Sequence, residues 1–270
     1  MKKYYKRALT IAGSDPSGGA GIQADLKAFS ACGCFGTSAI VAVVDENTVG
    51  VTGVHPVPVS FVMGQIKSVL DDIGTDAIKI GMLHSSELIM GIKETLLKYD
   101  VKNIVLDPVM VATSGDKLLQ NEAIETLKNE LIPMARVITP NIPEAEILLG
   151  KKISTQNDLF DVVKDLSFGR QVSVLLKAGH LEGDELTDVF YNAETDEVLK
   201  LTSKRVFTKN THGTGCTFSS AVAAFLAHGL SLNDAIQKGK EYINLAIVKG
   251  ADYEIGKGHG PVHHFFNFWE

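Results

Sequence analysis

The chain has 270 residues, of which 45% are hydrophobic and 21% are charged. This composition is that of a folded enzyme rather than a disordered chain, and the length fits one large α/β domain at least as well as two small ones. The net charge is −6, and no Lys/Arg cluster follows the first seven residues, which argues against nucleic acid as a partner.

Apolar runs typical of β-strands alternate along the chain with apolar patterns of helical period. The predicted strands cover residues 9–12, 38–44, 77–80, 103–106, 136–139 and 172–177. The predicted helices cover residues 22–31, 61–70, 87–99, 122–131, 144–149, 159–166, 217–227 and 234–248. Two short runs, at 189–191 and 198–201, flank a turn and predict an antiparallel hairpin.

Repeated strand–helix units predict an α/β fold, with a mainly parallel central sheet and helices on both faces. The chain shows no internal repeat, low-complexity segment or linker, so we expect residues 1–270 to form a single domain. Ligands of such sheets bind outside the carboxyl ends of the strands. The candidate site segments are therefore the strand ends, at residues 13–15, 45–47, 81–82, 107–108, 139–141 and 177–180.

A glycine-rich turn, Gly213-Thr214-Gly215-Cys216, precedes the predicted helix at 217–227. Backbone N–H groups at such a turn stay unpaired at the positive end of the helix dipole, which makes a site for an anion such as phosphate. The same position should favour the thiolate form of Cys216. The alternative is a tight turn in which Cys216 is only a small buried residue.

Three further acidic or basic side chains lie where a ligand could use them. Glu144 falls in the first turn of a predicted helix, where it either caps the helix or binds Mg²⁺, with Asp107 as a neighbour. Lys177 ends a buried strand, where its ammonium needs a partner such as a nucleotide phosphate unless it reaches solvent. Asp25 lies one turn inside the first helix and faces either the cleft or solvent.

These parts together indicate phosphoryl transfer without a Walker loop. They comprise an anion hole, a lysine, a carboxylate for the metal, and Cys216 as the base that deprotonates the acceptor hydroxyl. The glycine-rich loop at 13–21 lacks the Gly-Lys-Ser/Thr ending of a phosphate loop, and forms either a substrate loop or a flexible turn. A hydrolase built on His212 and Cys216 is a further alternative, but no third, orienting partner is visible.

Several segments, in order, resemble the hydroxymethylpyrimidine/phosphomethylpyrimidine kinases, which are thiamine-pathway members of the ribokinase-like superfamily. They are ALTIAGSD (8–15), SGGAGIQADLK (17–27), KIGML (79–83), DPVMV (107–111), ITPN (138–141), KAGH (177–180), HGTGCT (212–217) and GHGPVHH (258–264). The resemblance implies a ribokinase-like fold with a small flap, for which residues 112–116 are the candidate. It also implies ATP- and Mg²⁺-dependent phosphorylation of 4-amino-5-hydroxymethyl-2-methylpyrimidine and then of its monophosphate.

Carried over position by position, the resemblance also implies roles for individual residues. The pyrimidine pocket would be lined by Gly13, Asp25, Val44, Glu46, Met82 and Val109. ATP and its metal would be bound by Asp107, Thr139, Asn141, Glu144, Lys177, Thr211, Gly213 and Thr214. Gly213, Gly215 and Lys177 would act in catalysis with Cys216, which stands where relatives that phosphorylate sugars have an aspartate.

Glu46 departs from the family pattern, which commonly has a glutamine there that pairs with the amino group and a ring nitrogen of the pyrimidine. An ionised Glu46 only accepts hydrogen bonds. It therefore either pairs with a protonated ring in a charge-assisted contact or marks an altered specificity. A pyridoxal or pyridoxine kinase is accordingly the nearest alternative, because it shares the phosphate-handling parts and differs in the ring pocket.

A non-catalytic nucleotide or vitamin sensor on the same scaffold is the alternative of another class, because a fold does not fix a function. The resemblance further implies a homo-oligomer, a dimer. The longest apolar run, at 39–44, is far too short to cross a membrane, and three cysteines do not make a disulfide framework. We therefore expect a cytoplasmic protein without a membrane partner.

Overall fold

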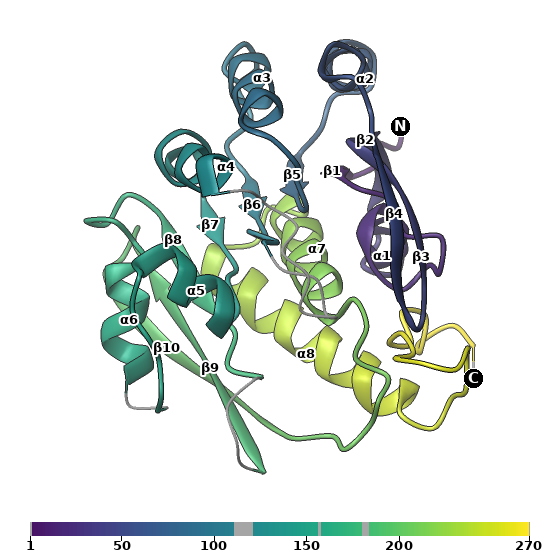
Figure 1. The fold of residues 1–270 in the computed structure, drawn as a ribbon, viewed down its shortest axis with the longest axis vertical. Coiled ribbons are helices and arrows are strands. Elements are labelled where there is room, and N and C mark those ends of the chain that lie inside the picture. Colours follow the sequence, from purple (N-terminus) through teal and green to yellow (C-terminus); the bar gives the residue numbers. More distant parts are fainter. Residues whose placement is uncertain (1, 111–120, 156–157, 180–183, 270) are drawn as a thin grey trace.

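The structure is a computed structural model and describes residues 2–110, 121–155, 158–179 and 184–269. An eight-stranded sheet runs through the molecule in the order β10-β9-β8-β7-β6-β5-β1-β2 (Figure 1). Its strands are β1 (Arg7–Ala12), β2 (Phe35–Ile40), β5 (Ala77–Ile80), β6 (Ile104–Leu106), β7 (Val137–Ile138), β8 (Ser173–Leu176), β9 (Glu185–Asn192) and β10 (Glu197–Lys204). The pairs from β2 to β8 are parallel, whereas β9 and β10 are antiparallel, so the predicted sheet and hairpin are confirmed.

Helices cover both faces of this sheet, as predicted. One face carries α1 (Gly21–Ala31), α7 (Thr214–Ala227) and α8 (Leu232–Gly250). The other carries α2 (Val59–Asp72), α3 (Ser86–Leu96), α4 (Asn121–Thr126), α5 (Ile142–Leu149) and α6 (Leu159–Asp165). A π-helical turn, Leu127–Leu131, and a short 3₁₀ turn, Ile132–Met134, continue α4.

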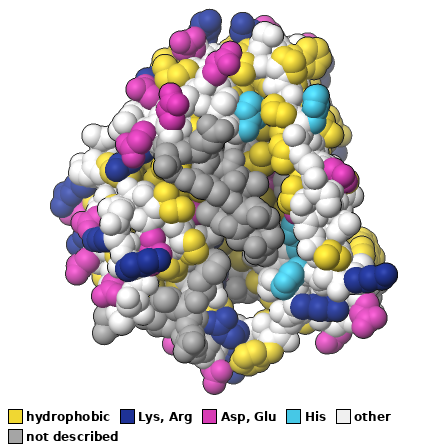
Figure 2. All heavy atoms as spheres, in the orientation of Figure 1, with side chains coloured by type: hydrophobic (Ala, Val, Ile, Leu, Met, Phe, Trp, Pro, Cys, Tyr) yellow, Lys and Arg dark blue, Asp and Glu magenta, His cyan; other side chains and the backbone are white. Residues whose placement is uncertain are grey.

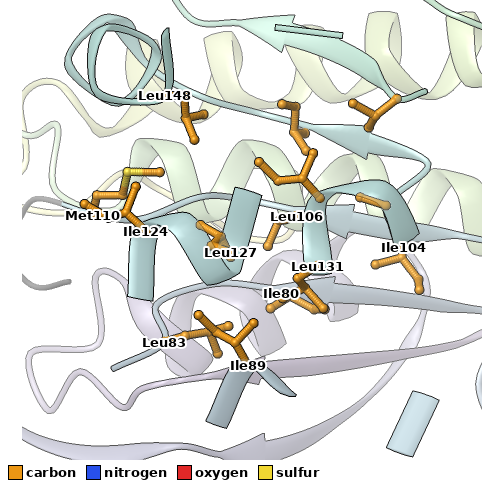
Figure 3. Packing of buried hydrophobic residues seen from close by; sticks show 14 of the residues in the cluster. Ile80, Leu83, Ile89, Ile104, Leu106, Met110, Ile124, Leu127, Leu131 and Leu148 are labelled. Carbon is orange, nitrogen blue, oxygen red and sulfur yellow. The ribbon is translucent and has the colours of Figure 1, made fainter. Parts of the chain in front are cut away.

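The two-residue period of the strands divides the core between these faces. On β1, Ala8 packs with the α7 and α8 cluster, whereas Leu9 belongs to the cluster on the opposite face. Figure 3 shows part of that second cluster, where Ile80 and Leu106 of the sheet lie beside Leu127. Because both faces are buried, the central strands read as continuous apolar runs.

The strand predicted at 38–44 is wrong as a single element, because the chain leaves the main sheet after β2. Residues Ala42–Asn47 form β3, which pairs with β4 (Gly50–Pro56) in a separate two-stranded antiparallel sheet. Val43 is 53% exposed there, so an apolar run does not distinguish a buried strand from this flap-like hairpin. β4 was not predicted from the sequence, because its two glycines and terminal proline are unfavourable in strands. The predicted flap, residues 112–116, lies outside the described residues.

Among the described residues, no helix is both long enough and apolar enough to cross a membrane. On the face shown in Figure 2, Lys and Arg side chains are interspersed with Asp and Glu. The predicted helix at 217–227 begins earlier than expected, at Thr214, so the glycine-rich turn itself forms the first turn of α7.

Candidate functional site

A cavity of about 920 Å³ lies along the carboxyl ends of the parallel strands. Its walls come from the segments that follow the strands and from the start of α7, as the topology predicts. Lining residues after successive strands are Gly13, Met82, Asp107, Asn141 and Lys177. The flap hairpin of β3 and β4 contributes Val44, Glu46, Val51 and Val54.

The start of α7 is built around Gly213, which caps the helix with a left-handed φ of 73°. A Cβ at this position would overlap the carbonyl oxygen of Gly19, so only glycine lets the two loops approach this closely. Within the described part of the chain, no side chain caps α7, and Thr214, Gly215 and Cys216 line the cavity. The N–H groups of this turn can therefore bind an anion.

The pKa of the Cys216 thiol differs from what the sequence predicted. Burial raises the pKa of its thiol to about 11, although the nearby Lys79 ammonium and the Gly21 N–H favour the thiolate. The predicted stabilisation of the thiolate by the helix terminus is therefore wrong, because the loss of hydration outweighs it. Cys216 is nevertheless only partly buried and lines the cavity, where a ligand could reach it.

Lys177 lies beside the α7 turn, where a Cβ on Gly215 would be 3.0 Å from Lys177 Nζ. Lys177 Nζ donates to Asp107 Oδ1 over 2.8 Å. Thr139 Oγ1 donates to the same oxygen over 2.8 Å, and Ser219 Oγ donates to Asp107 Oδ2 over 3.3 Å. Thr139 is fully buried and is absent from the cavity wall, so it reaches a ligand only through Asp107.

Glu144 has the helix-capping role considered for it, and its position leaves metal binding open as a second role. Its side chain accepts from the Asn141 N–H over 2.8 Å, and Asn141 Oδ1 accepts from the Glu144 N–H over 2.9 Å, which is a complete capping box. Both residues also line the cavity. Burial raises the pKa of Glu144 to about 7, despite the opposing charge of Lys177. A bound cation would therefore stabilise the carboxylate.

Asp25 does not line the cavity, contrary to what the resemblance implies. Its carboxylate is fully buried beneath Lys79, whose Nζ donates to both oxygens over 2.8 and 2.9 Å. The hydroxyls of Thr10 and Ser220 donate to it as well. Lys79 is the residue of this group that reaches the cavity, and the sequence analysis missed it although a lysine inside the apolar β5 was a signal.

The remaining predicted ring-pocket residues converge at one end of the cavity. A Cβ on Gly13 would be 3.3 Å from Met82 Sδ and 3.7 Å from Val44 Cγ2. Val109 also lines this end of the cavity, and Glu46 adds one carboxylate to its otherwise apolar wall. A flat ring fits such a pocket, with the carboxylate available for polar groups on the ring edge.

Asp15, from the candidate segment 13–15, and His212 lie next to Glu46, although the sequence predicted no role for either in phosphoryl transfer. His212 Nε2 is 2.8 Å from Asp15 Oδ2 and 4.0 Å from Glu46 Oε1. Burial lowers the pKa of His212, but the Asp15 carboxylate outweighs it and the net direction is upward. Burial and the Asp15 charge raise the pKa of Glu46. His212 thus pairs with Asp15 rather than with Cys216, which removes the geometry a Cys/His hydrolase needs.

The residues that line the opposite end of the cavity were also not predicted from the sequence. Val206, Ile243 and Ile247 form an apolar wall there. Beside it Lys240 pairs with Asp188 over 2.8 Å. These residues come from β9, α8 and the segment after β10, where the sequence offered only ordinary amphipathic patterns.

Comparison with known proteins decides the family. The model of the phosphomethylpyrimidine kinase family matches residues 15–263. The chain belongs to that family. A Rhizobium meliloti hydroxymethylpyrimidine/phosphomethylpyrimidine kinase is 45% identical over 264 residues, which are 97% of this chain and 98% of that protein.

Two solved structures similar to this chain have different activities, one as a phosphomethylpyrimidine kinase and one as a pyridoxal kinase. A phosphomethylpyrimidine kinase from Clostridium difficile is 43% identical, with a TM-score of 0.77 over 89% of this chain and 99% of that one. A Bacillus subtilis pyridoxal kinase in complex with ADP is 38% identical, with a TM-score of 0.87 over 97% of this chain and 98% of that one. The ribokinase-like fold is therefore shared by kinases for two different rings.

Of the residues that the family resemblance implied, all but Asp25 and Thr139 line the single cavity described above. Thr211 is exposed at its rim, just before the α7 turn. The residues that the resemblance implied therefore lie along one continuous cavity, which runs from Glu46 past the start of α7 to Val206, Ile243 and Ile247.

Proposed function

We propose that the protein transfers the γ-phosphoryl group of ATP to the hydroxymethyl group of 4-amino-5-hydroxymethyl-2-methylpyrimidine, and then phosphorylates the monophosphate to the diphosphate for thiamine biosynthesis. The observation that carries this proposal is the position of the α7 turn. It lies between a ring pocket and an apolar wall, with Lys177 beside it. Acceptor and nucleotide bound at the two ends would meet at an anion site.

The nucleotide occupies the end lined by Val206, Ile243 and Ile247, where adenine finds apolar contacts. Its phosphates extend to the N–H groups of Gly213 to Cys216, and Lys177 neutralises the transferred group. The ADP complex of the Bacillus subtilis relative supports a nucleotide site in this fold.

The residues fit Mg²⁺, because Glu144 and Asp107 are buried carboxylates at the same edge of the sheet. Glu144 and Asp107 would hold Mg²⁺, which would supply positive charge against the negative charge that develops on transfer. The raised pKa of Glu144 is consistent with a carboxylate that gains stability from a cation. Its capping bond with Asn141 orients it towards the cavity.

Cys216 accepts the proton of the acceptor hydroxyl in this proposal. Because burial raises the pKa of this thiol to about 11, most of it is protonated at neutral pH, and the minor thiolate form accepts the proton. A strong base is not required, because phosphoryl transfer passes through a loose transition state in which the hydroxyl loses its proton late. Lys79 favours the thiolate, so its ammonium offsets the negative charge of Cys216 before the proton is transferred.

Glu46 sets the ring preference. It pairs with the pyrimidine amino group and either donates its own proton to a ring nitrogen or accepts from a protonated ring. If this holds, Glu46→Gln changes the pH dependence of the KM for the pyrimidine. An unchanged profile would count against the protonation scheme and favour an altered specificity.

Pyridoxal is the second candidate acceptor, because the Bacillus subtilis pyridoxal kinase shares this fold and 38% identity. Initial rates of ADP formation with the pyrimidine, its monophosphate and pyridoxal, each with ATP and Mg²⁺, test the proposal. We expect the highest kcat/KM with the pyrimidines. A higher value with pyridoxal would overturn the assignment, and ATP binding without turnover would indicate a sensor.

The single domain, the homodimer and the cytoplasmic location remain predictions that rest on the sequence and the family resemblance. The mass of the purified protein in solution tests the dimer.

A further inference from the structure

Three side chains at the ring end of the cavity form a cluster that phosphoryl transfer does not use as a unit. Asp15 follows β1, Glu46 belongs to β3 and His212 precedes α7. One donor atom from each lies within 4.8 Å of the other two. His212 Nε2 is 2.8 Å from Asp15 Oδ2 and 4.0 Å from Glu46 Oε1, and Asp15 and His212 are buried.

The surroundings of Asp15 and His212 hold both side chains in place. The Asp15 carboxylate accepts from the N–H groups of Ser17 and Ala20 over 2.8 and 2.6 Å. A Cβ on Gly19 would overlap Cδ2 of His212, so the backbone there packs directly against the imidazole ring. Such outer partners orient the ligands of metal sites.

Glu46 supplies an independent indication of a ligand. The register between β3 and β4 shifts between Asp45 and Glu46, and such irregularities re-aim side chains next to functional sites. The Glu46 side chain is 19% exposed, and its Oε1 lies 4.0 Å from His212 Nε2. A carboxylate that is mostly shielded from water gains stability from a cationic partner.

We propose that Asp15, Glu46 and His212 bind a divalent transition metal of the Zn²⁺ type through Oδ2, Oε1 and Nε2. One imidazole and two carboxylates favour Zn²⁺ over Mg²⁺, which prefers oxygen ligands alone. Metal–ligand bonds of about 2.0–2.2 Å place tetrahedral ligand atoms roughly 3.3–3.5 Å apart. The observed spacings meet this with small side-chain movements, and the fourth position opens to the cavity.

Binding requires neutral His212, so the metal displaces the proton that the ion pair with Asp15 retains, and that proton passes to the buffer. The charged groups facing the imidazole are Asp15 and Glu46, while the C-terminal segment against it contributes Gly260 and Pro261. The metal fills space beside the ring pocket. On the proposed function, it therefore inhibits phosphorylation in competition with the pyrimidine.

Titration with Co²⁺ in the presence of excess Mg²⁺ tests the site directly, at a pH of about 8, above the ordinary pKa of histidine. We expect one equivalent to give the intense visible absorption of four-coordinate Co²⁺, and Zn²⁺ to displace it. Glu46→Gln should raise the Kd by at least about tenfold. Asp45→Asn is the matched control, since it removes the adjacent, exposed carboxylate and should leave the Kd unchanged.

Absence of the four-coordinate absorption in the folded parent protein would overturn the proposal. An equal Kd in Glu46→Gln and the parent, or an equal loss in Asp45→Asn, would also overturn it. Circular dichroism of each variant shows whether it is folded. This readout does not depend on turnover, so a protein that fails to phosphorylate pyrimidines but binds Co²⁺ refutes the proposed function and supports the metal site.

Discussion

Lys79→Met tests how much the buried ion pair between Lys79 and Asp25 contributes to stability. The substitution keeps the volume of the side chain but leaves the Asp25 carboxylate, which is 0% exposed, without its cation. Removing one partner of a buried ion pair costs about 3–5 kcal/mol of folding free energy. Thr10 and Ser220 still donate hydrogen bonds to Asp25, so the loss of folding free energy should lie near the lower end of this range. Urea unfolding followed by circular dichroism measures it.

The double variant Lys79→Met/Asp25→Asn completes this experiment. It removes both charges, so the free energy of unfolding should recover most of what the single variant loses, because the cost comes from the unpaired charge. A loss below about 1 kcal/mol in Lys79→Met, or a double variant as unstable as the sum of both singles, would refute the reasoning.

Three further variants follow from the site. Gly213→Ala should lower kcat by at least about 10²-fold in steady-state assays, because the added Cβ displaces the anion-binding turn. Gly229→Ala also has a positive φ but meets open space, so it should cost only about 1–2 kcal/mol in urea unfolding and leave kcat unchanged. Lys177→Ala should lower kcat by about 10²-fold, and an unchanged kcat would remove this lysine from the transition state. Burial raises the pKa of Glu144 to about 7, above the ordinary value of 4.5 expected in the unfolded chain, so the folded state keeps a proton that the unfolded state has lost. Stability should therefore fall as pH rises from about 4.5 to about 7, and Glu144→Gln should flatten this slope in pH-dependent unfolding. An equally steep slope in the variant would show that another group is responsible.

The position of the site could be predicted from the sequence because it depends on backbone topology. Parallel strands bring their carboxyl ends to one edge, so Asp107, Asn141 and Lys177 could be grouped without knowing any side-chain conformation. Gly213 could be read in the same way, since a glycine before a small-residue helix indicates a special backbone conformation.

Side-chain pairings could not be predicted in this way. A lysine in the apolar segment of β5 signals a buried charge, but nothing local says that its partner is Asp25, 54 residues earlier in the chain. The pair of Asp15 and His212 spans 197 residues. The acidity of Cys216 was misjudged because the helix terminus is visible in the sequence, whereas the extent of burial is not.

The hairpin of β3 and β4 could not be predicted from the apolar pattern. Residues 38–44 carry one apolar run, yet the chain passes from the edge strand β2 into β3 of a separate sheet within it. Hydrophobic periodicity reports how residues alternate along a strand and does not report which sheet the strand joins. The hairpin matters for function, because it brings Val44 and Glu46 to the ring pocket.

The ³¹P NMR spectrum of a reaction that contains the protein, ATP, Mg²⁺ and 4-amino-5-hydroxymethyl-2-methylpyrimidine tests the central claim most directly. We predict the phosphomonoester signal of the pyrimidine monophosphate first and the diphosphate doublets afterwards, with matching formation of ADP. A spectrum that shows only ATP and its slow hydrolysis to ADP and inorganic phosphate, while the same protein phosphorylates pyridoxal, would contradict the account.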